Sequence, residues 1–165
     1  MALRYALQLE KISWVKPENF HLTLKFLGKT TEEKLPAIRS ILQQVAGQTP
    51  AFSLKISGTG IFGSSYKPRV IWFGVENDII IRQLGETVLN HLDKAGFHRD
   101  RQNFVPHLTI GRINKINHKK MFQKAMADHR DDFLQESVVD KIILYESLLK
   151  PSGVVYQVVS KFPLG

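Results

Sequence analysis

His21-Leu22-Thr23-Leu24 and His107-Leu108-Thr109-Ile110 are two copies of one tetrapeptide. Successive side chains of a β-strand point to opposite faces, so each copy predicts a strand with His and Thr on one face and two aliphatic residues on the other. Two such strands side by side would bring together two imidazoles and two hydroxyls, which can hold a phosphate and move protons around it. One His-x-Thr is weak evidence, because structural histidines are common. Two copies point to one shared task.

Length and composition indicate an ordinary globular protein. The 165 residues suffice for one compact domain or two small lobes, and 43% of them are hydrophobic. No apolar run approaches the roughly 20 residues of a membrane span, and no secretory leader pattern opens the chain, so we expect a cytoplasmic protein without a membrane partner. The absence of cysteine excludes disulfides and thiol catalysis. A net charge of +8 favours a polyanionic partner, although a solvated basic surface would give the same value.

The apolar pattern predicts helices alternating with strands. Periodicity of three to four residues predicts helices over residues 2–11, 31–46, 78–95 and 118–128. Alternating or continuous apolar runs predict strands over residues 20–27, 52–58, 70–75, 106–113, 136–147 and 154–162. Thr30 and Glu33 are spaced as a capping box for the second helix, and Gly96 is placed to end the third. Pro151-Ser152-Gly153 forms a turn between the last two strands.

A repeat underlies this order. His107 follows His21 by 86 residues. The same offset carries four other elements onto elements of their own kind: helices 2–11 and 31–46 onto 88–97 and 117–132, and strands 52–58 and 70–75 onto 138–144 and 156–161. This predicts an internal duplication, and duplicated halves packed about an approximate two-fold axis would put His21 opposite His107. The strand at 70–75 also precedes the helix that begins the second half. An equivalent strand before the helix at 2–11 would fall before Met1, so we also expect that the chain lacks an N-terminal strand of its fold.

Three flanking segments extend the similarity beyond the tetrapeptides: W-V-K-P-E-N-F at 14–20, K-P-R-V-I-W at 67–72 and F-V-P-H-L-T-I-G-R at 104–112. With them the chain resembles the 2H phosphoesterase superfamily, and within it the RNA 2′,3′-cyclic phosphodiesterases, historically called 2′-5′ RNA ligases. The resemblance implies one bilobed α+β domain over residues 1–165. Each lobe would be an antiparallel sheet with helices on its outer face, and the active site would lie in the central cleft between the lobes.

The resemblance also implies a reaction. It is the hydrolysis of RNA 2′,3′-cyclic phosphate ends to 2′-phosphomonoesters without metal or other cofactor, with 2′-5′ ligation as the reverse reaction in some members. The partner would be such RNA ends, and the chain would act as a monomer. By motif, the catalytic residues are His21 and His107, and the phosphate-binding residues are Thr23 and Thr109. A neutral and a protonated imidazole together supply a base and an acid. The symmetry of the motifs leaves open which is which; we favour His21 as the acid and His107 as the base.

Three further residues are candidate substrate contacts: Arg112, Lys25 and Phe20. Lys25 shares strand parity with His21 and Thr23, or is merely exposed to solvent. Arg112 follows the second motif as an arginine often does in the family. Its parity is opposite to that of His107, so it would need a twist or a strand end to reach the same face. Phe20, Trp14 and Phe104 could stack on a base, but we expect core packing for at least two of them.

Other features of the sequence carry no function in this interpretation. We consider the remaining histidines, 91, 98, 118 and 129, incidental. No H-E-x-x-H or P-loop motif indicates a metal or ATP. Two alternatives stay open: a phosphodiesterase acting on 2′-5′ oligonucleotides or small cyclic nucleotides, and a non-catalytic RNA-binding or nucleotide-binding module.

Overall fold

The computed structural model describes residues 2–64, 66–99, 103–151 and 153–165. The chain divides into two compact units, each assembled from three segments. Unit 1 consists of Met1–Leu22, Lys55–Glu76 and His107–Ser137. Unit 2 consists of Thr23–Leu54, Asn77–Pro106 and Val138–Gly165.

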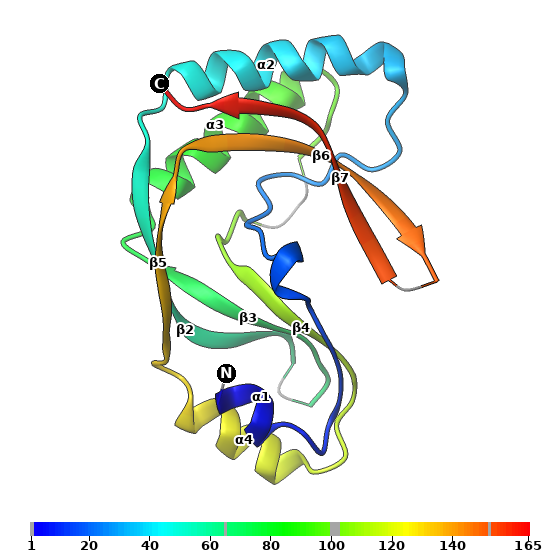
Figure 1. Ribbon diagram of the computed structural model, residues 1–165, viewed down its shortest axis with the longest axis vertical. Coiled ribbons are helices and arrows are strands. Elements are labelled where there is room, and N and C mark those ends of the chain that lie inside the picture. Colours follow the sequence, from blue (N-terminus) through cyan, green and yellow to red (C-terminus); the bar gives the residue numbers. More distant parts are fainter. Residues whose placement is uncertain (1, 65, 100–102, 152) are drawn as a thin grey trace. The chain divides into compact units, whose positions relative to one another are not determined.

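Unit 1 is built on a five-stranded sheet in the order β1-β4-β3-β2-β5. Its strands are β1 Lys11–Trp14, β4 Leu108–Lys115, β3 Pro68–Glu76, β2 Phe52–Gly63 and β5 Phe133–Val139. The pairs β1–β4, β4–β3 and β3–β2 are antiparallel. Helices α1 (Ala2–Ala6) and α4 (Lys119–Asp128) cover one face of this sheet (Figure 1). The core contains side chains from the helices and from alternate positions of the strands: Leu3, Leu7, Phe122, Ile71, Phe73, Leu108 and Ile110.

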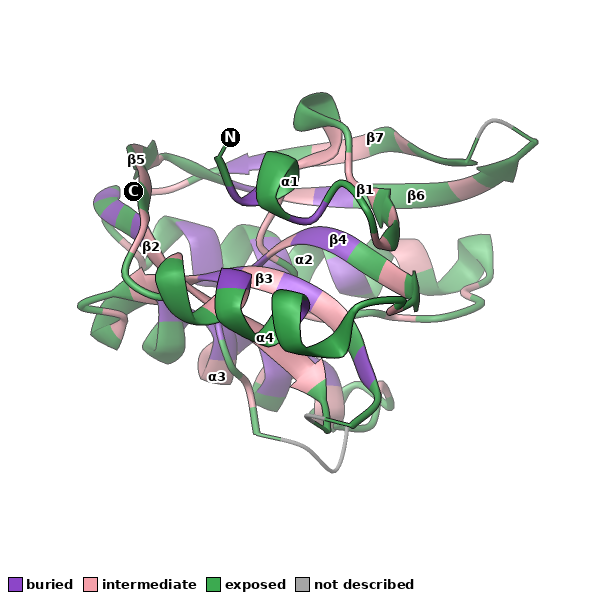
Figure 2. Cartoon of the chain, turned by 90° about the horizontal axis from the view of Figure 1, so that it is seen from below, coloured by how far each residue is buried: buried purple, intermediate pink, exposed green. Residues whose placement is uncertain are grey.

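Unit 2 contains the two longest helices, α2 (Leu35–Gly47) and α3 (Ile79–Lys94), and the hairpin of β6 (Lys141–Lys150) and β7 (Gly153–Pro163). Helix α2 packs against α3 and against both strands of the hairpin. The apolar stripes of the helices recur every three or four residues, and the buried residues of these stripes are coloured purple on the ribbon in Figure 2. Each fully buried aliphatic side chain of such a core contributes about 1.5–3 kcal/mol. The core includes Ile38, Leu42, Val45, Ile81, Leu84, Val88, Leu92, Ile142, Leu144 and Phe162.

Three of the four predicted helices are confirmed as α2, α3 and α4, with a short 3-10 helix, η2 (Glu32–Lys34), leading into α2. Gly96 ends α3 as predicted, with a φ of +89°. The prediction of a capping box is wrong. No side chain caps α2, and the Thr30 hydroxyl donates to the Gly28 carbonyl at 3.3 Å. The first helix ends at Ala6 rather than at residue 11, because residues 7–10 form turns and strand β1, which pairs with β4, begins at Lys11.

Most predicted strands are present with altered bounds. Segments 52–58, 70–75, 106–113 and 154–162 correspond to β2, β3, β4 and β7, of which β2 is longer by five residues at its end. The segment 136–147 is not one strand, since Asp140 separates β5 from β6. The strand expected at 20–27 is wrong: of these residues only Leu22 forms a β-bridge. In the turn before Gly153, Ser152 lies outside the described residues.

The fold is α+β, as predicted. The 86-residue offset carries β2 and β3 onto β6 and β7, and both pairs are antiparallel. Gly60 of β2 pairs with Trp72 of β3. The offset would carry this pair onto Glu146 and Val158, whereas Glu146 pairs with Gln157, so the two registers differ by one residue. These registers agree with an internal duplication, which stays a prediction, as does the missing N-terminal strand. No helix in the described segments is long and apolar enough to cross a membrane.

Candidate active site

The second tetrapeptide begins strand β4. Leu108 and Ile110 are buried in the core of unit 1, while His107 and Thr109 are half-buried. The predicted alternation of a core face and a polar face is therefore confirmed for this copy. The His107 ring meets the ring of Phe62 edge to face, with 4.6 Å between their centroids.

The first tetrapeptide has less regular surroundings. It follows the 3-10 helix η1 (Pro17–Asn19), whose last turn is closed by the Phe20 N–H donating to the Pro17 carbonyl at 3.0 Å. The His21 Nδ1 lies 2.7 Å from the Asn19 carbonyl oxygen. A carbonyl oxygen only accepts, so this contact assigns the proton to Nδ1 and leaves Nε2 as the nitrogen that can exchange protons with a ligand.

An antiparallel bridge between Leu22 and Leu108 joins the two copies. Residues opposite each other in such a pair share a face, so Leu22 lies on the same side as the buried Leu108, and the residues flanking both lie on the other side. Continued by one residue on each side of the bridge, this register would place His21 across from Thr109 and diagonal to His107. Diagonal neighbours have Cβ atoms roughly 7–8 Å apart, which leaves room for a phosphate between two imidazoles. The bridge therefore places the segments that carry His21 and His107 side by side within unit 1.

Arg112 reaches the same face through a β-bulge. Trp72 pairs with Thr109, but the next residue towards the start of β3, Ile71, pairs with Gly111, so β4 contains one extra residue at this point. Arg112 then pairs with Val70, which has the parity of Trp72. The bulge reverses the parity that the sequence alone assigned to Arg112. Its side chain is exposed on the face of Thr109.

An aromatic pair occupies this face between β4 and β2. Trp72 lies between Thr109 and Gly60 in the sheet, and its ring centroid is 5.5 Å from that of Phe62. A Cβ at Gly60 would lie 2.2 Å from the Trp72 ring, so only glycine fits beneath the indole. The Trp72 Nε1 is buried and has no hydrogen-bond partner within the described segments. The indole N–H is therefore a donor at the polar face of unit 1.

The other candidate contacts have different surroundings. Thr23 is exposed and is the first residue of unit 2. Lys25 also belongs to unit 2, where its Nζ donates to the His98 carbonyl at 2.8 Å. Phe20 is half-buried beside η1. Trp14 lies under the Arg4 guanidinium, and Phe104 packs on Gly85 of α3, so these two rings are held by the fold.

The remaining histidines have structural partners or solvent around them. The His91 ring nitrogen lies 2.9 Å from the Thr87 carbonyl, and that of His129 lies 2.7 Å from the Asp132 carboxylate. His118 is exposed beside Glu10, and the exposed His98 is 3.6 Å from Asp93. Within the described segments, no three His, Asp or Glu residues gather as a group that could hold a metal ion.

A sequence profile of the 2′-5′ RNA ligase superfamily matches residues 10–150, most of the chain. The chain belongs to this superfamily. A Thermotoga maritima relative named RNA 2′,3′-cyclic phosphodiesterase is 40% identical over 147 residues, which are 88% of this chain and 76% of that protein. An Aquifex aeolicus relative of the same name is 36% identical over 154 residues, 92% of this chain and 81% of that protein.

Solved structures of related folds agree with this membership of the 2′-5′ RNA ligase superfamily. A Thermus thermophilus crystal structure has a TM-score of 0.77 at 28% identity, covering 99% of this chain and 90% of its own. Escherichia coli LigT without ligand has a TM-score of 0.71 at 23% identity over 96% of this chain and 82% of its own, which is a likeness of fold.

Sequence reasoning missed three residues of the polar face: Gly60, Phe62 and Trp72. The continuous apolar run Val70-Ile71-Trp72-Phe73 predicts a strand but gives its tryptophan no separate role. The available signal was the alternation of Trp72 with the two fully buried residues Ile71 and Phe73. Gly60 gave no signal, because its need for a hydrogen side chain arises from an indole on the neighbouring strand.

Proposed function

We infer that this chain is an RNA 2′,3′-cyclic phosphodiesterase in which His21 and His107 form the acid and base pair. The activity rests on membership of the superfamily and on the similarity to relatives that carry this name. The bridge between Leu22 and Leu108 is the observation that carries the assignment of residues, because its register turns both histidines to one face. Both histidines and Thr109 come from a single chain, so a monomer supplies the acid and the base.

The reaction needs two proton transfers at one phosphorus. One imidazole takes a proton from water, whose oxygen bonds to phosphorus. The bond from phosphorus to O3′ breaks, and the second imidazole gives its proton to O3′. The product is a 2′-phosphomonoester with a free 3′-hydroxyl. The Asn19 carbonyl holds the His21 ring through Nδ1, so Nε2 is the atom that transfers the proton. We assign the acid to His21 and the base to His107.

Hydroxyl and guanidinium groups would stabilise the charge that builds up on the non-bridging oxygens. Thr109 is across from His21 in the bridge register, and we propose that its hydroxyl donates to one of these oxygens. Thr23 follows Leu22 directly and shares strand parity with His21, so we propose the same role for it. Arg112 offers a planar fork of donors on the face of Thr109 and would bind the phosphate or the next nucleotide.

The test is the turnover of a short RNA that ends in a 2′,3′-cyclic phosphate, measured in the presence of EDTA. We expect a 2′-phosphate product, distinguished from a 3′-phosphate by chromatography against standards, and a rate that EDTA does not change. The rate should follow a bell-shaped curve against pH, because one imidazole must be neutral and the other protonated. A 3′-phosphate product, or a rate abolished by EDTA and restored by metal, would contradict the mechanism.

The same assay separates the alternatives. A relative specialised for 2′-5′ linkages would cleave 2′-5′ oligoadenylate faster than the cyclic-phosphate RNA. A purely binding module would turn over neither substrate. Ligation is a second candidate activity, favoured by the superfamily to which the chain belongs. It would appear as a 2′-5′ linked product when a 5′-hydroxyl RNA is present in excess over the cyclic-phosphate end.

A further inference from the structure

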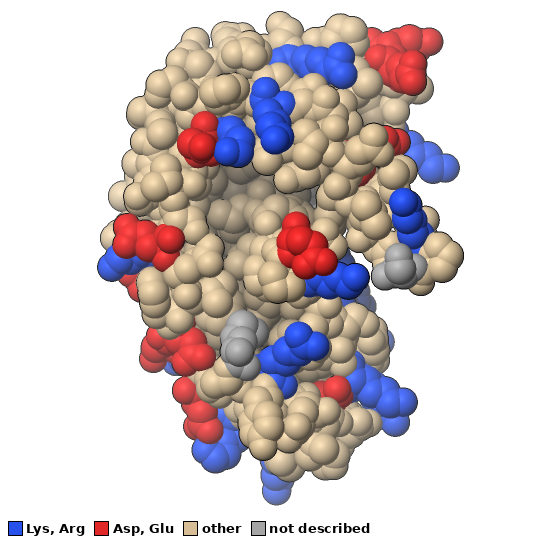
Figure 3. Space-filling model, viewed as in Figure 1, with Lys and Arg blue, Asp and Glu red and all other residues tan. Residues whose placement is uncertain are grey.

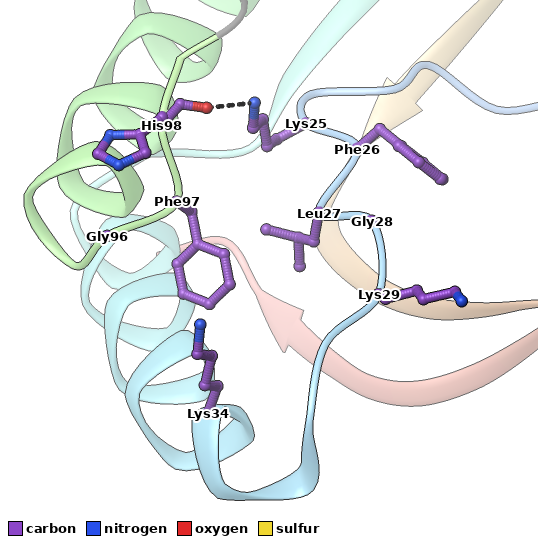
Figure 4. Close-up of a pocket in the computed structure, with 9 residues that line it drawn as sticks. All are labelled: Lys25, Phe26, Leu27, Gly28, Lys29, Lys34, Gly96, Phe97 and His98. Carbon is purple, nitrogen blue, oxygen red and sulfur yellow. Dashed lines mark hydrogen bonds between the residues drawn. The ribbon is translucent and has the colours of Figure 1, made fainter.

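Unit 2 contains a pocket of about 320 Å³ that the mechanism does not use. It lies between the segment after the first tetrapeptide and the turn that follows α3 (Figure 4). In Figure 4 the Leu27 and Phe97 side chains point into the pocket, with the Lys34 and Lys25 ammonium groups near its two ends. The volume falls in the range of small-molecule sites. Residues lining it include Lys25, Leu27, Lys29, Lys34, Phe97 and His98.

Long-range contacts hold the pocket together. The Lys25 Nζ donates to the His98 carbonyl at 2.8 Å and so ties together segments that are 73 residues apart. Gly96 has a φ of +89°, and this turn at the end of α3 presents Phe97. The Lys34 Nζ lies 5.4 Å from the centroid of the Phe97 ring. An ammonium group thus borders an aromatic face, the combination with which proteins bind a phosphate and a base of single-stranded RNA.

The charge around the pocket has one sign. Three lysines line it, and none of its lining residues is acidic. Glu32 and Glu33 precede Lys34 but are exposed and do not line it, while the Asp93 carboxylate is 3.6 Å from the His98 ring outside it. Elsewhere, on the face of the molecule shown in Figure 3, basic and acidic side chains are interspersed. The pocket therefore combines positive potential with apolar surface at one place.

We propose that this pocket binds a nucleotide of the single-stranded RNA substrate, upstream of the cyclic end. The proposal rests on the proposed function, since it assumes that the cyclic phosphate is held by the two histidines. Lys34 contacts the phosphate of the bound nucleotide, and Phe97 stacks on its base with Leu27 beside it. Lys25, which lines the pocket, follows His21 by four residues in the chain.

Binding is tested with a fluorescent single-stranded RNA that ends in a 3′-hydroxyl and is not turned over. Its anisotropy is titrated with the whole protein over a series of salt concentrations. Lys34→Gln should weaken binding about threefold to tenfold and reduce the slope of log K against log salt by about 0.7, the value for one phosphate contact on a single strand. Lys124→Gln is the matched control, because this exposed lysine of α4 undergoes the same loss of charge. It should bind RNA as the wild type does.

A second variant tests the aromatic part of the pocket. Phe97→Leu keeps an apolar side chain against the α3 turn but removes the stacking face, and it should weaken RNA binding about fivefold or more. Thermal melting of each variant checks that it is folded. Wild-type affinity and salt slope in both Lys34→Gln and Phe97→Leu would overturn the proposal. A loss in Lys34→Gln alone would also overturn it, because it would indicate contact with phosphate and none with a base.

Kinetics separate this proposal from the proposed function. With a cyclic-phosphate RNA of several nucleotides, Lys34→Gln should raise KM about threefold to tenfold and leave kcat unchanged. With a nucleoside 2′,3′-cyclic phosphate, which has no upstream nucleotide, both constants should equal those of the wild type. If the wild type binds RNA through Lys34 and Phe97 but hydrolyses neither substrate, the pocket stands and the proposed function fails. If both substrates are hydrolysed and Lys34→Gln affects them equally, the pocket proposal fails alone.

Discussion

The two tetrapeptides differ by a single residue in sequence but much more in their surroundings. In His107-Leu108-Thr109-Ile110, Leu108 and Thr109 pair with β3 as the first residues of β4, and Leu108 also forms the bridge to Leu22. In His21-Leu22-Thr23-Leu24 only Leu22 pairs, through one isolated bridge. The second histidine directly precedes β4, and its ring packs edge to face with the Phe62 ring. A short 3-10 turn and a hydrogen bond to the Asn19 carbonyl hold the first.

The two histidines, for which we propose equivalent chemical roles, are therefore held by structure of unequal strength. Segments with few ladder hydrogen bonds open at lower free energy than central strands. We therefore expect His21 to depend on its local turn and His107 to depend on the packing of the sheet.

The largest effect is expected on removing either imidazole. His21→Ala and His107→Ala should each lower kcat by about 10²–10⁴-fold on cyclic-phosphate RNA, because each proton transfer contributes that much. The double variant should be little worse than the poorer single variant, because acid and base act in one step. Rates are measured with EDTA present. His91→Ala, whose ring contacts the Thr87 carbonyl in α3, is the control and should retain activity. Full activity in either single variant would end the case for a histidine pair.

Removing a threonine hydroxyl should have the next largest effect. Thr109→Val and Thr23→Val preserve side-chain shape but lose one donor to the phosphate, and kcat should fall about 10²–10³-fold in each. Thr59→Val is the control. Its hydroxyl donates to the His129 carbonyl at 2.9 Å, so its loss should lower the melting temperature and spare kcat. If only Thr109→Val is impaired, the two copies do not bind the phosphate equally.

A larger side chain at position 60 should displace the Trp72 ring and disturb the packing around His107. Gly60→Ala places a methyl group inside the contact distance of the Trp72 ring, and overpacking of this kind costs about 1–3 kcal/mol of the free energy of unfolding. Trp72 contacts Phe62, which contacts His107, so kcat should fall as well. Gly47→Ala, at the end of α2 with open space around a Cβ, should leave both unchanged or raise stability by about 0.4–1 kcal/mol. Equal melting curves for the two variants would show that the indole moves aside freely.

The smallest effect should come from loosening the turn before the first copy. Pro17→Gly makes the 3-10 turn more flexible and should cost about 0.4–1 kcal/mol of stability. Because this turn positions His21, kcat should fall about twofold to fivefold. Pro50→Gly is an exposed proline before β2, and this control should lose similar stability with no loss of kcat. Equal kcat values in the two variants would mean that the turn does not position His21.

The sequence alone determined the helices α2, α3 and α4, the polar and core faces of β4, and the family resemblance. These follow from the period of apolar residues and from the short motifs, which are local properties of the chain. His21, His107 and Thr109 can be named as candidates from the sequence because each tetrapeptide, when extended, puts its His and Thr on one face. That reasoning failed for the strand expected at 20–27, where the segment has the right alternation but only one paired residue.

The orientation of Arg112, the requirement for Gly60 and the pocket at Lys25 depend on contacts between distant parts of the chain. The bulge opposite Ile71 turns Arg112 to the face of Thr109, although the parity of the sequence predicted the other face. The need for glycine at position 60 arises from Trp72 on the next strand, and the pocket at Lys25 closes through a carbonyl 73 residues away. The physical reason is the same in each case. Alternation along a strand is set by neighbouring residues, whereas pairing register, bulges and close contacts depend on which distant strand lies alongside.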